Sequence, residues 1–86
     1  MDTVELGKRI KNRRLELNLT QSDVKQKTGI STGNLSDIER GRSAPSASAL
    51  CELSDVLEYS VDYILFGKTR NTDKAKLSDI REQLTP

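Results

Sequence analysis

A single glycine between two short helical patterns constrains the fold of this chain more than any other feature of the sequence. Thr20 and Ser31 are good N-cap residues for helices over residues 21–28 and 32–40, and Gly29 lies between the two patterns. The residues expected to face inward lie at helical spacing: Val24, Thr28, Leu35 and Ile38. A sharp turn between helices that cross at about 90 to 120° needs a residue that adopts a positive φ at low cost, and glycine is that residue. The segment therefore predicts a helix-turn-helix motif.

The rest of the chain up to Gly67 predicts three further helices. A first helix should begin near Asp2 and end near Asn18, with core positions at Leu6, Ile10 and Leu17. A fourth helix follows a loop at 41–46 that contains glycine and proline, and its apolar face comprises Ala47, Leu50, Leu53, Val56 and Leu57. A fifth helix should start at Ser60 and end at Gly67, with an inner face of Val61, Ile64 and Leu65.

Length and composition are those of one small globular domain. The chain has 86 residues, of which 34% are hydrophobic and 31% are charged. A domain of this size buries only about 60 to 65% of the surface of its unfolded chain, so dimerisation would add stability. No run approaches the length of a membrane span and no apolar signal follows Met1, so we expect a cytoplasmic protein without membrane contact. Cys51 is the only cysteine, and we expect a small buried hydrophobe in a helix, with a reactive thiol as the alternative.

We divide the chain into a helix-turn-helix domain over 1–67 and a further segment over 68–86. The second segment opens with a polar linker, after which three apolar residues can form one stripe of a short helix: Leu77, Ile80 and Leu84. A helix this short is only marginally stable on its own, so we expect it to dock on its own domain, to dock on a partner subunit, or to fray. The aromatic residues gather at the fifth helix, where they either close the core or meet a second subunit: Tyr59, Tyr63 and Phe66. These six residues form the candidate dimer interface.

The net charge of +1 conceals an uneven distribution. Residues 1–42 hold nine Lys/Arg and six Asp/Glu, giving +3, whereas residues 43–86 hold five and seven, giving −2. The basic residues are concentrated in the first helix and after the third: Lys8, Arg9, Lys11, Arg13, Arg14, Arg40 and Arg42. A run of charge is often only a solvated helix face, but its position beside a helix-turn-helix favours double-stranded DNA as the partner.

Three stretches carry a family resemblance: LTQSDVKQKTGIS, LSDIERGRSAPS and LEYSVDYILFG. Together they resemble the lambda-repressor/Cro family, also called XRE-type helix-turn-helix regulators, over about Leu6 to Gly67. The resemblance implies an all-α fold, a compact five-helix bundle, to which this chain adds a possible short C-terminal helix. It also implies a transcriptional regulator, more often a repressor, that binds an inverted-repeat operator as a homodimer with its third helix in the major groove.

The same resemblance implies contacts to the DNA backbone. Gln21 matches a position that contacts a phosphate, which suits the free N–H groups of a helix N-terminus, although an ordinary solvent-exposed residue is the alternative. Arg14 and Glu39 match a pair that in some members joins the first helix to the end of the third, and Arg14 can also reach the DNA backbone. Further phosphate contacts are expected just after the third helix, from Arg40, Arg42 and Ser43.

Positions that read bases in the family fall at the start of the third helix: Ser31, Thr32, Gly33, Asn34 and Asp37. Asn34 can pair with adenine N6 and N7, or serve only as a polar surface residue or as a partner of the N-cap. Thr32 can contact a thymine methyl, and Asp37 can accept from cytosine N4 or remain a surface acid. Gly33 costs about 1 kcal/mol of helix propensity relative to Ala, which suggests close approach of the backbone to DNA or to a neighbouring helix.

The sequence argues against an enzyme. It contains no histidine, no cluster of metal-binding residues, and neither a GxGxxG nor a P-loop run, so we expect no catalytic site, metal or cofactor. An alternative keeps the fold but replaces DNA by a protein partner, such as a regulator, a toxin or a subunit of a larger repressor, contacted through the C-terminal segment. DNA binding weakens steeply with added salt, whereas an apolar protein contact does not, so the two hypotheses are separable.

Overall fold

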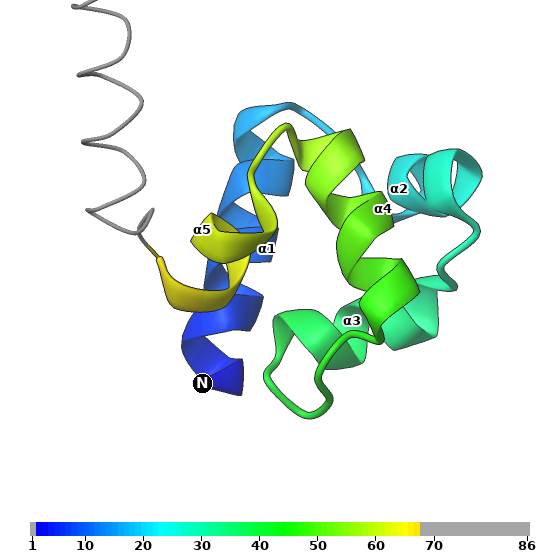
Figure 1. The fold of residues 1–86 in the computed structure, drawn as a ribbon. Helices are drawn as coiled ribbons and strands as arrows, with labels where there is room; N and C mark the ends of the chain where they lie inside the picture. The colour runs from blue at the N-terminus through cyan, green and yellow to red at the C-terminus, as the bar shows by residue number, and fades with distance from the viewer. Residues whose placement is uncertain (1, 68–86) are drawn as a thin grey trace, which may run out of the picture.

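The computed structural model describes residues 2–67, and within that range the chain forms five α-helices and no strand (Figure 1). The helices are α1 (Thr3–Glu16), α2 (Gln21–Thr28), α3 (Thr32–Glu39), α4 (Ala47–Leu57) and α5 (Val61–Phe66). They confirm the predicted all-α fold and lie close to their expected positions, although α1 ends slightly before Asn18. The predictions for 68–86, which include the linker and the stripe of Leu77, Ile80 and Leu84, lie outside the described residues.

Each helix begins after a residue whose side-chain oxygen accepts an N–H group of the first turn. These N-caps are Asp2, Thr20, Ser31, Ser46 and Ser60. At α2 the contact is reciprocal, because Asp23 accepts the N–H of Thr20 at 2.8 Å and Thr20 Oγ1 accepts the N–H of Asp23 at 3.0 Å. The N–H of Thr20 lowers the pKa of Asp23. This contact therefore stabilises the fold above the ordinary carboxyl pKa, and the contribution is lost as the pH falls through the lowered value.

The turn between α2 and α3 depends on Gly29, as the sequence predicted. Gly29 has a φ of 82°, in the left-handed region, and its N–H donates to the carbonyl of Lys25 at 2.7 Å. A Cβ added at this position would have no atom within 4 Å. The site therefore requires the backbone conformation of glycine rather than its small size. Ile30 follows the turn and is buried against the core.

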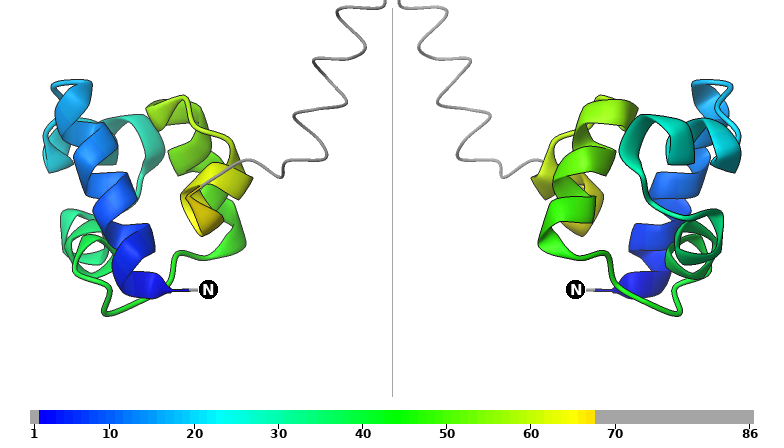
Figure 2. Two further views of the ribbon diagram at one scale, coloured as in Figure 1. Left: turned by 90° about the vertical axis from the view of Figure 1, so that its left-hand side faces the viewer. Right: turned by 90° about the vertical axis from the view of Figure 1, so that its right-hand side faces the viewer.

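One core fills the space between the helices. Its buried members are Leu6, Ile10, Val24, Ile30, Leu35, Ile38, Ala49, Leu53, Leu57 and Ile64. The long helix α1 packs on α3, α4 and α5, and α2 packs on α3 and α4. In the left view of Figure 2, α1 lies in front, with α3 on one side of it and α4 and α5 on the other. No described helix combines the length and the apolar character that crossing a lipid bilayer requires.

Two predictions about α4 are wrong. Ala47 is exposed and Ala49 is buried in its place, and Cys51 is exposed rather than buried. The buried stripe of α4 runs through Ala49, Leu53 and Leu57 at a spacing of four residues, which follows one face of a helix. Cys51 lies two residues from Ala49, on the opposite face, and Ala47 lies in the first turn, at the margin of the packed surface.

Gly7 allows α1 and α3 to approach closely, a role that the sequence analysis did not assign. It is buried in the middle of α1, and a Cβ added there would overlap the carbonyl oxygens of Ile38 and Glu39. The end of α3 therefore rests directly on the backbone of α1. Gly41 continues this contact, because it has a φ of 80° and a Cβ added there would lie 2.8 Å from Cα of Val4.

Two arginines of α1 bind the ends of other helices. Arg9 donates through Nε to the carbonyl of Ile64 at 2.9 Å and through Nη2 to that of Leu65 at 2.8 Å. Arg13 donates through Nε to the carbonyl of Leu57 at 2.9 Å. A cation at a helix C-terminus satisfies carbonyls that have no partner within the helix. Arg9 and Arg13 therefore hold α5 and α4 in place, although in the sequence they resemble the other basic residues near the motif.

The aromatic residues at α5 differ in their environments. Tyr59 is half-buried against the core and lies under the guanidinium of Arg13, with 4.6 Å from Cζ to the ring centroid. Its ring meets that of Tyr63 edge-on, with centroids 4.4 Å apart, and burial raises the pKa of Tyr59. Phe66 is 51% exposed. Tyr59 therefore covers part of the core and Tyr63 packs on its ring, whereas Phe66 presents apolar surface to the outside.

Candidate nucleic-acid interface

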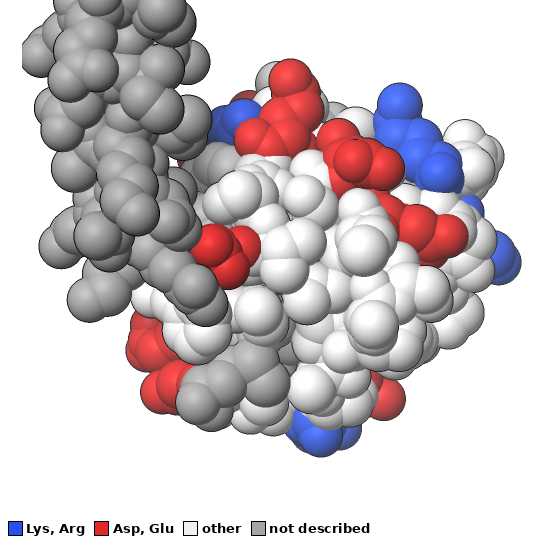
Figure 3. All heavy atoms as spheres, in the orientation of Figure 1, with Lys and Arg blue, Asp and Glu red and all other residues white. Residues whose placement is uncertain are grey.

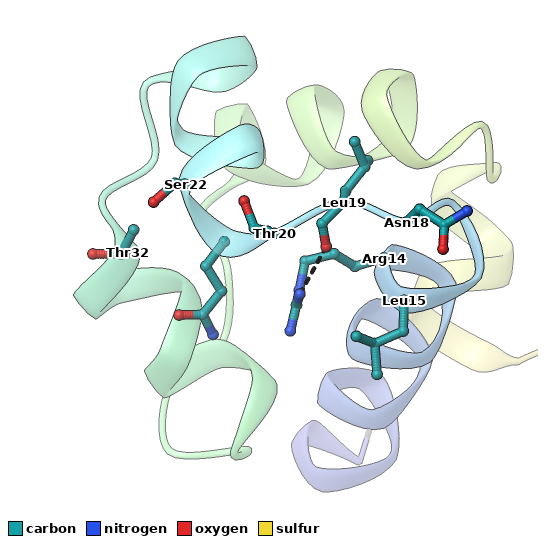
Figure 4. Close-up of a pocket in the computed structure, with 8 residues that line it drawn as sticks. Arg14, Leu15, Asn18, Leu19, Thr20, Ser22 and Thr32 are labelled. Atoms are coloured by element: carbon teal, nitrogen blue, oxygen red, sulfur yellow. Dashed lines mark hydrogen bonds between the residues drawn. The ribbon is translucent and has the colours of Figure 1, made fainter.

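Arg14 on α1 and Glu39 at the end of α3 form a buried ion pair. Nε of Arg14 donates to Oε2 of Glu39 at 2.7 Å, and Nη2 donates to Oε1 at 3.0 Å. Nη1 donates to the carbonyl of Leu19 at 2.8 Å, as the dashed line in Figure 4 shows. The two side chains are only 9% and 4% exposed. The pair that the family resemblance implied is thus formed, and it ties α1 to α3 and to the loop before α2.

Gln21 extends this pair to the start of α2. Its Nε2 donates to Oε1 of Glu39 at 3.2 Å, and its Oε1 accepts from the hydroxyl of Ser36 at 3.3 Å. Both contacts fix the orientation of the amide. The resemblance implied a phosphate contact for Gln21 but gave no role to Ser36, which lies three residues before Glu39 on the same face of α3.

The first turn of α3 is open to the outside. Asn34 and Gly33 are exposed, and Thr32 and Asp37 are half-buried. Ser31 Oγ accepts the backbone N–H of Asn34 at 3.1 Å, so the cap occupies the main chain of Asn34 and leaves its side chain without a hydrogen bond among the described residues. A Cβ added at Gly33 would meet nothing within 4 Å, which rules out close packing on a neighbouring helix. Close approach of a ligand remains as a reason for glycine there.

The residues after α3 lie at the other end of this helix. Arg40 and Arg42 are exposed and Ser43 is half-buried. The backbone N–H groups of Arg42 and Ser43 both donate to the carbonyl of Asp37, at 2.9 and 3.4 Å. These bonds fold the loop back onto α3. The guanidinium groups of Arg40 and Arg42 form no ion pair among residues 2–67.

Two hollows lie beside α3 and are lined by some of these residues. The larger, of about 620 Å³, lies between the end of α1 and the starts of α2 and α3 (Figure 4). Figure 4 shows Ser22 and Thr32 on one side of it, Leu15 and Asn18 on the other, and Arg14 between them. A second hollow shares Arg14 and Gln21 with the first and reaches Arg40. The surface beside α3 is therefore hollowed near Thr32 at one end and near Ser36 and Glu39 at the other.

The charges of the molecule favour this surface over the opposite one. Residues 47–67, which include α4 and α5, contain no Lys or Arg and four acidic residues: Glu52, Asp55, Glu58 and Asp62. Figure 3 shows acidic side chains scattered over this face, with basic side chains at its margins. A polyanion is therefore repelled by the α4–α5 face and attracted to the side formed by α1, α2 and α3.

Comparison with known proteins finds a helix-turn-helix family and relatives that include transcriptional regulators and repressors. A family model described as helix-turn-helix matches residues 10–64. The HTH-type transcriptional regulator ImmR of Bacillus subtilis (strain 168) is 37% identical over 71 residues, which make up 83% of this chain and 55% of ImmR. Repressor protein C2 of Salmonella phage P22 is 35% identical over 75 residues, which make up 87% of this chain and 35% of that repressor. This chain thus spans about a third to about half of the length of these relatives.

The fold is also similar to a solved structure. The crystal structure of the P22 c2 repressor in complex with synthetic operator 9T, in the presence of Tl+, matches with a TM-score of 0.71 and 35% identity. The match covers 73% of this chain and 96% of that chain. The relatives are named as regulators and repressors, in agreement with the prediction that this chain is not an enzyme. Because the family model matches more than half of the sequence, the chain belongs to the lambda-repressor/Cro-like, XRE-type family of helix-turn-helix proteins.

Proposed function

We propose that this chain is a sequence-specific, double-stranded DNA-binding transcriptional regulator, and in particular a repressor. The observation that carries the proposal is the state of α3, whose first turn is exposed while its last residue, Glu39, is held by Arg14 and Gln21. A recognition helix needs both an open N-terminal end and a fixed direction, because that end reaches the base edges in the major groove. The names of the relatives support the same function.

In this proposal the start of α3 reads the base sequence. Asn34 pairs with an adenine, Thr32 contacts a thymine methyl, and Asp37 accepts from a cytosine N4. Ser31 uses its oxygen lone pair for the cap and keeps its hydroxyl hydrogen for DNA. Gly33 lets the backbone come close to the floor of the groove, because no side chain intervenes.

The proposed phosphate contacts lie near both ends of α3. Gln21 and Arg14 lie beside the start of α2, and the residues beyond the far end of α3 are Arg40, Arg42 and Ser43. Such contacts set the position of the protein on the duplex and carry no sequence information.

We further propose a homodimer on an inverted-repeat operator. Two copies related by a two-fold axis place their α3 helices in successive major grooves, about 34 Å apart. The proposed interface lies at α5, where Tyr59, Tyr63 and Phe66 gather and where Phe66 leaves apolar surface uncovered. Burial of that surface in a dimer supplies stability that a domain of this size lacks alone.

Replacing Asn34 with Ala is expected to reduce affinity for the preferred operator by about 1 to 3 kcal/mol and to relax the preference at one base pair of each half-site. The change removes a base contact but leaves the N-cap intact, because Ser31 binds the backbone of Asn34. Fluorescence anisotropy with the operator and its single-base variants measures both effects.

Arg42→Ala is the matched variant for the phosphate contacts. It should weaken binding to all sequences by a similar factor and reduce the dependence on salt concentration. An unchanged base preference in the Asn34 variant would remove Asn34 from the set of base-reading residues, and a base-specific loss in the Arg42 variant would contradict its assignment to the backbone.

A further inference from the structure

The outer surface of α4 carries an apolar stripe that residues 2–67 leave open. Ala47 and Cys51 are exposed, and Leu50 is half-buried. These three residues are spaced three and four positions from Ala47, so their side chains are neighbours on one side of the helix. Figure 3 shows an uncharged area in the middle of the α4–α5 face, with acidic side chains on several sides of it. The stripe is therefore an unpartnered helix face.

The charges beside this stripe are all negative. Glu52, Asp55 and Glu58 of α4 are exposed, and Asp62 of α5 is half-buried. None of the four forms an ion pair among the described residues, and the sequence from 47 to 67 contains no Lys or Arg. An occupant of the stripe is therefore expected to combine an apolar centre with cationic flanks.

Beyond the described residues, the sequence of 74–84 has this complementary pattern. In a helix, Lys74 and Arg81 would lie next to the apolar stripe, because they are spaced three residues before and four residues after its first member. Asp79 and Glu82 would lie on the opposite side of the same helix. The apolar residues themselves share one side at helical spacing: Leu77, Ile80 and Leu84.

The connection to α5 is long enough for this segment to reach α4 of the same domain. Residues 68–73 span at most about 20 Å when extended. The whole of α4, at eleven residues, is about 16 Å long, and α5 packs directly on it. A short tether also gives the segment an effective concentration of the order of millimolar at its own domain. The same chain is therefore favoured over a second copy as the source of the occupant.

We propose that residues 74–84 form an amphipathic helix that docks on the α4 stripe of its own domain and covers Cys51. Packing of Leu77, Ile80 and Leu84 on the stripe supplies the stability that a short helix lacks alone. Lys74 and Arg81 then lie toward the acidic residues of α4. The docking surface contains none of the residues proposed to contact DNA, so docking is independent of the proposed function.

The reactivity of Cys51 tests this docking, because it is the only cysteine of the chain. Its rate of modification by N-ethylmaleimide is measured by mass spectrometry in the unmodified chain and in two variants, Ile80→Asp and Ala75→Asp. Both variants add one acid outside the five helices, but Ala75 lies five residues before Ile80 and on the far side of the expected helix. A segment docked for about nine-tenths of the time slows the reaction about tenfold, because only the open form reacts.

We expect the unmodified chain and Ala75→Asp to react about tenfold more slowly than Ile80→Asp, at rates that dilution does not change. Equal rates in all three proteins would overturn the inference and leave the stripe open to a different partner. Protection that weakens on dilution would also overturn it, because the segment would then cover a second copy. Loss of protection in Ala75→Asp as well as in Ile80→Asp would contradict the assignment of the apolar side of the segment to the docking contact.

Discussion

Replacing Glu39 with Ala is expected to lower the free energy of unfolding by about 3 to 5 kcal/mol, because it leaves the Arg14 guanidinium buried without its counterion. The side chain of Arg14 is only 9% exposed, so water replaces little of the interaction that the lost carboxylate provided. The change also removes the acceptor of the Gln21 amide. Domains of this size are stable by about 4 to 13 kcal/mol, so the loss is a large share of the total. Urea unfolding followed by circular dichroism measures it.

The double variant Arg14→Met, Glu39→Leu shows whether the loss of stability in Glu39→Ala comes from the unpaired charge of Arg14 or from the lost contact between α1 and α3. Buried ion pairs replaced by apolar residues of similar size are often neutral or stabilising, so the double variant should recover most of the loss. It should also bind DNA more weakly than the unmodified protein if Arg14 contributes to phosphate binding. A loss below about 1 kcal/mol in Glu39→Ala would be typical of an exposed ion pair and would contradict the burial of Arg14 and Glu39.

Gly7→Ala is expected to destabilise the fold by about 1 to 3 kcal/mol, although alanine is the better helix former. The added methyl group would overlap the carbonyl oxygens of Ile38 and Glu39, which are backbone atoms and cannot rotate away. The helices α1 and α3 would have to separate, and the ion pair between Arg14 and Glu39 would lengthen.

Gly33→Ala is the matched control for Gly7→Ala, because it makes the same chemical change in another helix. Its new Cβ would meet nothing within 4 Å, so the gain in helix propensity, up to about 1 kcal/mol, should appear as increased stability. Thermal or urea unfolding of both variants provides the comparison. Equal effects of the two substitutions would contradict the close packing of α1 on α3.

Much of the fold is predictable from the sequence, because local signals determine it. The N-caps Thr20 and Ser31 and the turn at Gly29 depend on residues next to each other in the chain. The partnership of Arg14 with Glu39 came from the family resemblance, since residues 25 positions apart give no local signal.

The features that the sequence did not predict depend on the direction in which a residue points and on the helix that packs against it. Arg9 and Arg13 look like the other basic residues of the first helix, but they lie on the face that packs against α4 and α5, whose free carbonyls attract them. Gly7 is an unfavourable residue within a helix by propensity alone, but the close packing of α3 on α1 requires it. Cys51 belongs to an apolar stretch, yet it lies opposite the buried stripe of α4. Each of these depends on the packing of distant elements, which periodicity does not record.

The central claim is that α3 reads a base sequence, and selection of bound duplexes from a random pool at about 150 mM salt tests it most directly, because that concentration suppresses purely electrostatic binding. We expect enrichment of a two-fold-symmetric site whose half-sites are centred about one helical turn apart. Recovery of bound duplexes without a preferred sequence would contradict the claim and leave the basic surface with non-specific contacts only.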